Sequence, residues 1–173
     1  MQVKEKLPDF VLAELYNKSL VFVDDGSKQK KVVEDFKEPQ KLYLGNYEKK
    51  IIVLVNDAEN SYLSDESLHF LSGILNACKL NLAHIAVINF NNNALSFSEL
   101  KKQLQPVFLL SFGITALQIE LPFTMPDYQV QLYDNCHIVT APPLTVLNSE
   151  TSGAITEKKK LWKSLQKMFS LEK

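Results

Sequence analysis

Apolar and polar positions follow two different patterns on either side of about residue 49. Beyond it, short continuous apolar runs alternate with stretches whose apolar residues recur every three or four positions. Continuous runs of this kind indicate strands buried on both faces, whereas the spaced positions indicate amphipathic helices. The predicted strands are 51–55, 84–88, 107–112 and 137–140.

Three helices are predicted among these strands. The first covers 66–79 and carries a stripe of apolar residues: Leu68, Leu71, Leu75 and Cys78. The second follows Ser96, which forms a capping-box pattern with Glu99, and runs to Gln105. The last begins at a Thr156 cap and has its own apolar stripe, with Trp162 at the edge: Leu161, Leu165, Met168 and Phe169.

Two short turns and an irregular front complete the prediction. Gly113 opens a helical turn that Pro122 stops, and residues 141–144 form a proline-rich rigid turn. Ahead of residue 49, the pattern predicts a short helix over 9–16, a strand over 20–23 and an exposed connection over 24–38.

Strands that alternate with helices indicate a parallel sheet with right-handed crossovers. We therefore predict a single domain over 1–173, with an N-terminal part (1–48) and a core (49–173). The core is expected to be an α/β three-layer sandwich around a mainly parallel four-stranded sheet. Ligand sites in such folds lie beyond the carboxyl ends of the strands, here the loops that begin at Asn56, Asn89, Gly113 and Ala141.

The composition is that of an ordinary globular protein, with 46% hydrophobic and 23% charged residues in 173. Cys78 and Cys136 lie far apart, without the spacing of a disulfide framework or a zinc site. The first residues lack the apolar core of a signal peptide, and the sequence has no run long enough to span a membrane. These features lead us to expect a cytoplasmic protein.

The charge pattern argues against strong nucleic-acid binding. The net charge is −1, and all 19 basic residues are lysine, whereas bidentate recognition of phosphate or guanine favours arginine. Lysines gather near the C-terminus, where a basic face is expected from Lys158, Lys159, Lys163 and Lys167. We interpret this face as solvated, with weak or absent direct DNA binding.

The strand-end loops offer limited chemistry. They contain neither a glycine-rich phosphate loop nor a Gly-x-Ser-x-Gly elbow, so Gly113 is interpreted as a tight-turn residue. The histidines fall away from the carboxyl ends of the predicted strands and are interpreted as structural: His69, His84 and His137. Asp57 and Glu59 are either solvated acids near a helix start or a pair that activates water or holds a hard cation. We predict no cofactor and no metal.

Five segments in order resemble the uracil-DNA glycosylase superfamily over roughly 49–171: IIVLVNDAEN, HIAVINF, FLLSFGITAL, HIVTAPPLTVL and KKKLWKSLQKMF. The resemblance implies that fold, with Asn89 at the position that reads the flipped base. The loop 56–60 lacks the superfamily's glycine, proline and stacking aromatic, and Thr140 or Ala141 stands in place of its histidine. The strand-end positions are therefore interpreted as a degenerate pocket: Asn56, Asp57, Glu59, Asn89, Gly113, Thr140 and Pro142.

Four segments resemble a non-catalytic relative of that fold, the psi subunits of bacterial DNA polymerase III: the opening helix and strand at 12–23, VND at 55–57, APPLTVL at 141–147 and KLW at 160–162. This resemblance implies a bridging subunit that binds a chi-like protein on one face and a clamp loader through an N-terminal peptide. The opening MQVKEKLPDF shows no clear counterpart of that peptide.

We predict a non-enzymatic, replication-associated interaction protein. One alternative is a divergent nucleobase-processing enzyme that uses Asp57 or Glu59 with Asn89. The other is a small-molecule-binding protein of the same fold. An interaction protein would expose an apolar patch away from the strand ends, whereas an enzyme would have a concave strand-end pocket with convergent polar groups.

Overall fold

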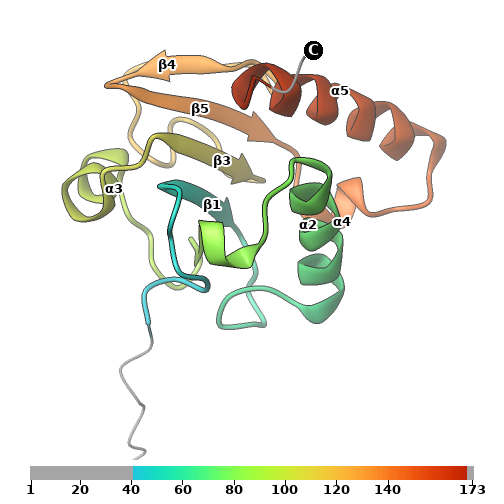
Figure 1. The fold of residues 1–173 in the computed structure, drawn as a ribbon, viewed down its shortest axis with the longest axis horizontal. Helices are drawn as coiled ribbons and strands as arrows, with labels where there is room; N and C mark the ends of the chain where they lie inside the picture. Colours follow the sequence, from blue (N-terminus) through green and yellow to red (C-terminus); the bar gives the residue numbers. More distant parts are fainter. Residues whose placement is uncertain (1–40, 171–173) are drawn as a thin grey trace, which may run out of the picture. The chain divides into compact units, whose positions relative to one another are not determined.

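A mixed five-stranded sheet lies at the centre of the computed structural model, which describes residues 41–170 (Figure 1). The described residues fall within one unit, Pro39–Lys173. The predictions for 9–16, 20–23 and 24–38 lie outside the described residues, and the single-domain assignment stays a prediction.

Four of the strands are parallel neighbours, and they correspond to the four predicted runs. Their bounds are β1 Ile51–Val55, β2 Ile85–Asn89, β3 Phe108–Phe112 and β5 Cys136–Ala141. The order across the sheet is β2-β1-β3-β5-β4, so β1 and β3 are flanked by parallel strands on both sides. The α/β class and the parallel core of the sheet are therefore confirmed for the described residues.

The prediction of four strands is wrong, because a fifth strand pairs antiparallel with β5 and makes the sheet mixed. This strand, β4 (Gln131–Tyr133), ends in a two-residue turn and returns as β5. Asp134 and Asn135 form the turn with φ of 46° and 56°. Left-handed residues at both central positions match the twist of a two-stranded hairpin.

Side chains of the parallel strands alternate between two apolar cores. In β1, for example, Val53 and Val55 face one core, while Ile52 and Leu54 face the other. Every residue of β1 and β2 is buried, which explains why both strands are continuous apolar runs.

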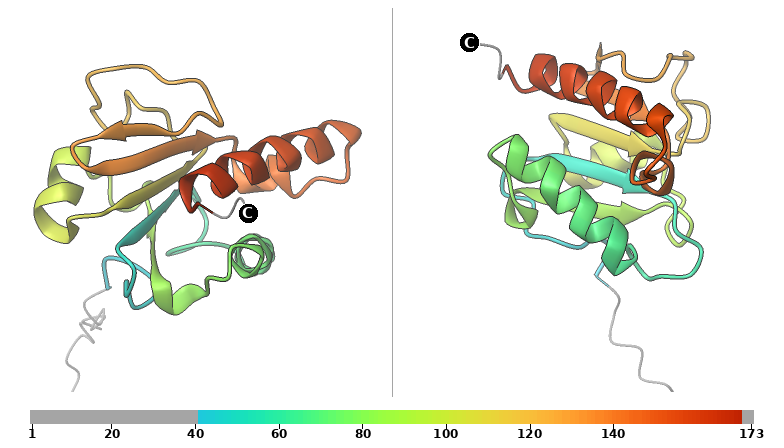
Figure 2. Two further views of the ribbon diagram at one scale, coloured as in Figure 1. Left: turned by 45° about the horizontal axis from the view of Figure 1, so that its top comes forward. Right: turned by 90° about the vertical axis from the view of Figure 1, so that its right-hand side faces the viewer.

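Helices cover the two faces unequally (Figure 2). One face packs against α2 (Asp65–Ala77), α4 (Leu144–Leu147) and α5 (Ser152–Met168). The other packs against α3 (Phe97–Leu104) and the irregular chain that follows β3. The described residues thus form helix, sheet and helix layers. None of the helices within 41–170 combines the length and the apolar content that crossing a bilayer requires.

Two helix starts test the predicted caps. The capping box is confirmed, because Ser96 Oγ accepts from the Glu99 N–H while Glu99 accepts from the Ser96 N–H at 2.8 Å. The Thr156 cap is wrong: α5 begins at Ser152, and Thr151 caps it by accepting from the Ala154 N–H. The buried stripe of Leu161, Leu165 and Met168 is confirmed.

Short irregular segments close the ends of the sheet. The predicted start of the second strand, His84, belongs instead to a 3-10 turn, η1 (Leu82–His84). Residues 116–120 form a turn that closes where the Leu121 N–H donates to the Ala116 carbonyl. At the outer edge of β2, Leu44 pairs its backbone with Val87 through two hydrogen bonds of 2.8 and 2.9 Å.

Candidate functional site

The loop that follows β1 is organised around the carboxylate of Asp57. Its Oδ1 accepts from the N–H groups of Glu59 and Asn60, each at 3.0 Å. Its Oδ2 accepts from the Ser64 N–H, also at 3.0 Å, and the Asn60 side-chain amide donates to both oxygens. Because Ser64 caps α2, Asp57 links the end of β1 to the start of that helix.

These hydrogen bonds also set the charge state of Asp57. Burial by itself raises the pKa of this carboxyl, but hydrogen bonds from Glu59, Asn60 and Ser64 outweigh burial and lower the pKa below its ordinary value. Asp57 is therefore ionised at neutral pH and serves as an acceptor, which is unsuited to the role of a general acid.

Asn89, at the end of β2, fixes the same loop from the neighbouring strand. Its Nδ2 donates to the carbonyls of Asp57 at 2.7 Å and Asn60 at 2.8 Å. Its Oδ1 accepts from the N–H groups of Asp57 and Asn91, both at 3.1 Å. A side-chain amide has two donors and two acceptor positions, so the hydrogen-bonding capacity of this buried residue is fully used.

A cleft of about 350 Å³ lies at the carboxyl ends of β1 and β3. The loop after β1 forms one wall, with Asn56, Asp57 and Glu59 among its residues, and the start of α4 forms the other. The remaining predicted pocket positions do not line this cleft: Asn89, Gly113, Thr140 and Pro142.

Gly113 packs closely against Pro143, which lines the cleft just before α4. Gly113 has a φ of +73°, and a Cβ at this position would lie 2.8 Å from Cγ of Pro143. Its N–H donates to the carbonyl of Ala141 at 2.8 Å. Glycine is therefore required for close packing of the end of β3 against the turn at Pro142 and Pro143, as expected for a tight-turn residue.

Thr140 points away from the cleft. The residue is 3% exposed and pairs with Ser111 across the sheet, on the face covered by α3. Its Oγ1 has no hydrogen-bond partner among the described residues. Its carbonyl accepts from the Tyr128 N–H at 2.8 Å, which holds the chain before β4 against β5.

The histidines and cysteines lie outside the cleft. His84 accepts from the Asn81 N–H at 3.1 Å, His137 stacks on Phe108, and His69 is exposed on α2. Burial raises the pKa of Cys78 to about 11 and of Cys136 to about 12, so both remain thiols at neutral pH. Within residues 41–170, no three His, Cys, Asp or Glu side chains cluster closely enough to hold a metal ion.

The predicted basic face lies along α5. Lys159, Lys163 and Lys167 are exposed. Lys158 is half-buried, and its ammonium lies 5.2 Å from the centre of the Phe70 ring on α2. Lys160 makes a 2.8 Å ion pair with Glu157, and hydrogen bonding from Lys160 lowers the pKa of that carboxyl.

An apolar groove of about 440 Å³ lies between α2 and α5, away from the strand ends. Figure 2 shows both helices on the same side of the sheet. One side of the groove is formed by α2 and the other by α5: His69, Phe70, Gly73, Ile74 and Ala77 from α2; Lys158, Leu161, Trp162 and Leu165 from α5. The predicted apolar stripe of α2 did not include the side that lines the groove, although Phe70, Ile74 and Ala77 form a second apolar stripe on this helix.

Comparison with models of known protein families finds no match to this sequence, and comparison with curated proteins likewise finds no relative. The structure defines the class of the protein: an α/β fold with a mixed sheet, a cleft at the strand ends and an apolar groove between two helices on one face.

Proposed function

We propose that this chain is a non-catalytic interaction subunit of the replication machinery, similar to psi subunits, that bridges clamp-loader components. We further propose that its described residues have a uracil-DNA glycosylase-like fold. The resemblance of the segments at 55–57, 141–147 and 160–162 supports both proposals.

The hydrogen bonding of Asn89 is the observation that supports the non-catalytic assignment. The resemblance to uracil-DNA glycosylases implies that Asn89 would read a base. However, all four of its hydrogen-bonding positions are used by the backbone of Asp57, Asn60 and Asn91. Reading a base would require these bonds to break, and each buried backbone group left without a partner costs about 1–3 kcal/mol.

The groove supports the interaction role. Its lining is predominantly apolar, and it contains Phe70 and the chain's single tryptophan, Trp162. Aromatic side chains that line a hollow are the usual anchors of protein–protein contacts.

Affinity capture from the native organism tests the proposal. The full chain carries a C-terminal tag, and the recovered proteins are identified by mass spectrometry against a tag-only control. We expect enrichment of chi-like or clamp-loader subunits. Their absence, with other proteins enriched instead, would reject the replication assignment.

A second candidate is a nucleobase-processing or small-ligand-binding protein, favoured by the concave cleft that Asn56, Asp57 and Glu59 line. We expect the purified chain to release no uracil from single- or double-stranded DNA that contains uracil. Uracil release that is lost in Asp57→Ala and Glu59→Gln variants would replace the proposed function with this one.

A further inference from the structure

We infer that the groove between α2 and α5 binds an acidic amphipathic helix of a partner protein. This inference rests on the proposed function only in taking the partner to be a protein, and it adds the partner's secondary structure, charge and docking position.

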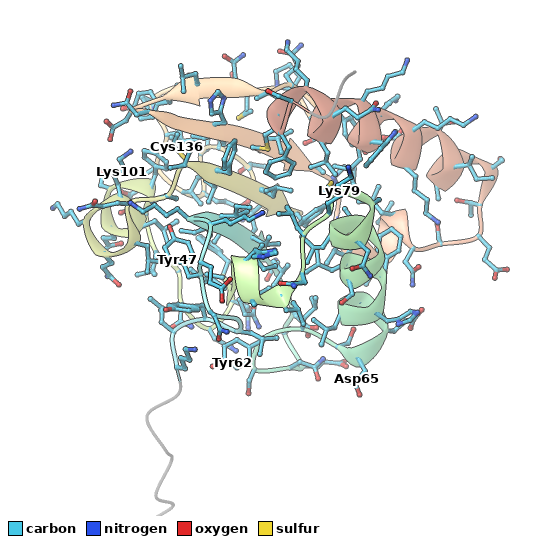
Figure 3. The ribbon with its side chains drawn as sticks, viewed as in Figure 1. Tyr47, Tyr62, Asp65, Lys79, Lys101 and Cys136 are labelled. Atoms are coloured by element: carbon cyan, nitrogen blue, oxygen red, sulfur yellow. The ribbon has the colours of Figure 1, made fainter. Side chains whose placement is uncertain are left out.

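The shape of the groove fits a helix. Figure 3 places Lys79 just beyond the end of α2, and Lys79 lines a hollow together with Met168 and Phe169, so the two helices approach each other at their C-terminal ends. Gly73, in the middle of α2, has no atom within 4 Å of the position that a Cβ would occupy. A helix laid along this opening would contact the aromatic rings of Phe70 and Trp162 on opposite walls.

A second hollow lies farther along both helices, near their C-terminal ends. It has a volume of about 390 Å³, and its lining includes Cys78 and Lys79 next to α2, and Met168 and Phe169 at the end of α5. The two hollows together follow α5 from Lys158 to Ser170. At a rise of 1.5 Å per residue this path is about 18 Å long, which accommodates a helix of three turns or slightly more.

The charges along this path indicate an acidic partner. Lys158 lines the first hollow, and Lys49 and Lys79 line the second. His69 also lines the first hollow. Among the described residues, neither hollow is lined by a carboxylate. Lys159 and Lys163 lie exposed on α5 and extend the positive field beyond the rim.

A synthetic peptide provides the probe. It is an amphipathic helix of about 14 residues, with leucine or phenylalanine at i, i+3, i+4 and i+7 and glutamate on its remaining faces. A peptide with the same leucines and phenylalanines and lysine in place of glutamate serves as the control. Because Trp162 is the only tryptophan and lines the groove, its fluorescence reports binding in the intact full chain. We expect a saturable blue shift with the acidic peptide and little change with the basic one.

Two pairs of variants locate the binding site. Gly73→Glu places a bulky anion in the groove, and Gly153→Glu places the same residue on α5 outside it, where a Cβ also has room. We expect Gly73→Glu to lower the affinity for the acidic peptide about tenfold or more, and Gly153→Glu to leave that affinity unchanged. Lys158→Glu is expected to weaken binding several-fold at low salt, whereas Lys167→Glu, at an exposed position outside both hollows, has little effect.

Circular dichroism melting of the four variants shows that each one is folded. Three results would overturn the inference: equal binding of the acidic and basic peptides, unchanged affinity in folded Gly73→Glu, or displacement of the peptide by an equal concentration of DNA. A concentration-dependent dimer that Gly73→Glu abolishes would also overturn it, because the occupant would then be a second copy of the chain. The proposed function is judged separately: capture of replication subunits that persists in Gly73→Glu rejects the groove and retains the function.

Discussion

The side-chain amide of Asn89 satisfies backbone groups that would otherwise be buried without partners. Replacing Asn89 with alanine removes four hydrogen bonds to Asp57, Asn60 and Asn91. We expect a loss of about 2–4 kcal/mol in the free energy of unfolding, measured by urea denaturation.

Asn92 provides the matched control for this prediction. Its amide also donates to loop carbonyls, those of Asn60 and Ser61, but the residue is exposed. Water can replace these bonds, so Asn92→Ala is expected to cost less than about 1 kcal/mol. Equal losses in the two variants would show that burial of Asn89 does not decide its contribution.

Asp57 gives the stability a dependence on pH. Because its folded-state pKa is lowered, the ionised carboxylate stabilises the folded chain at every pH above the unfolded-state value of about 4. This contribution is lost as the pH falls through the folded-state value. We therefore expect the stability difference between the wild type and Asp57→Asn to be constant from pH 5 to 7 and to shrink below about pH 4. Urea denaturation across this pH range measures the difference, and a difference independent of pH would contradict the assignment.

At the scale of elements, the true start of α5 can be tested by its cap. Thr151 accepts from the Ala154 N–H, whereas Thr156 lies inside the helix and is exposed. Thr151→Ala is expected to lower the free energy of unfolding by about 1 kcal/mol. Thr156→Ala is expected to be neutral or slightly stabilising, because alanine is the better helix former. Thermal melting of both variants decides between the two positions, and the reverse ranking would restore Thr156 as the cap.

The pattern of apolar residues predicted the buried strands but missed β4, which is largely exposed. The runs at β1 and β2 are recognisable because parallel strands covered on both faces need apolar residues at every position. β4 has three residues, two of them exposed, so it carries no such signal. The dipeptide Asp134-Asn135 was the available clue, since these residue types tolerate the left-handed conformation that a tight hairpin requires.

The same reasoning limits what the sequence shows of the site. Because the carboxyl ends of parallel strands meet at one edge of a sheet, the sequence predicted that Asp57 and Asn89 lie at that edge. The structure places the two residues in contact. Whether Asn89 faces a ligand or the loop depends on backbone atoms 32 residues away in the chain, which no local pattern encodes. The groove likewise arises from the spacing of two helices that are remote in sequence.

For the molecule as a whole, substitution of the lysines on α5 tests binding separately from packing. We expect a variant with Lys158, Lys159, Lys163 and Lys167 all changed to glutamine to keep its melting temperature within a few degrees, since the apolar stripe is untouched. The wild type is expected to bind DNA weakly at physiological salt, because its net charge is −1. Fluorescence anisotropy with labelled DNA measures this, and micromolar affinity that the four changes abolish would contradict the prediction.

The strand order β2-β1-β3-β5-β4 has a consequence for folding during translation. β1 is translated first among the described strands, yet one of its neighbours is β3, with Ile51 opposite Phe108. At about 5–20 residues per second, an all-apolar β1 leaves the exit tunnel several seconds before that neighbour does. During this interval the edge of β1 that will pair with β3 has no partner, and the strand contains no charged residue that would oppose aggregation. Demand for chaperones should therefore peak while the middle of the chain is being translated and fall once β3 emerges.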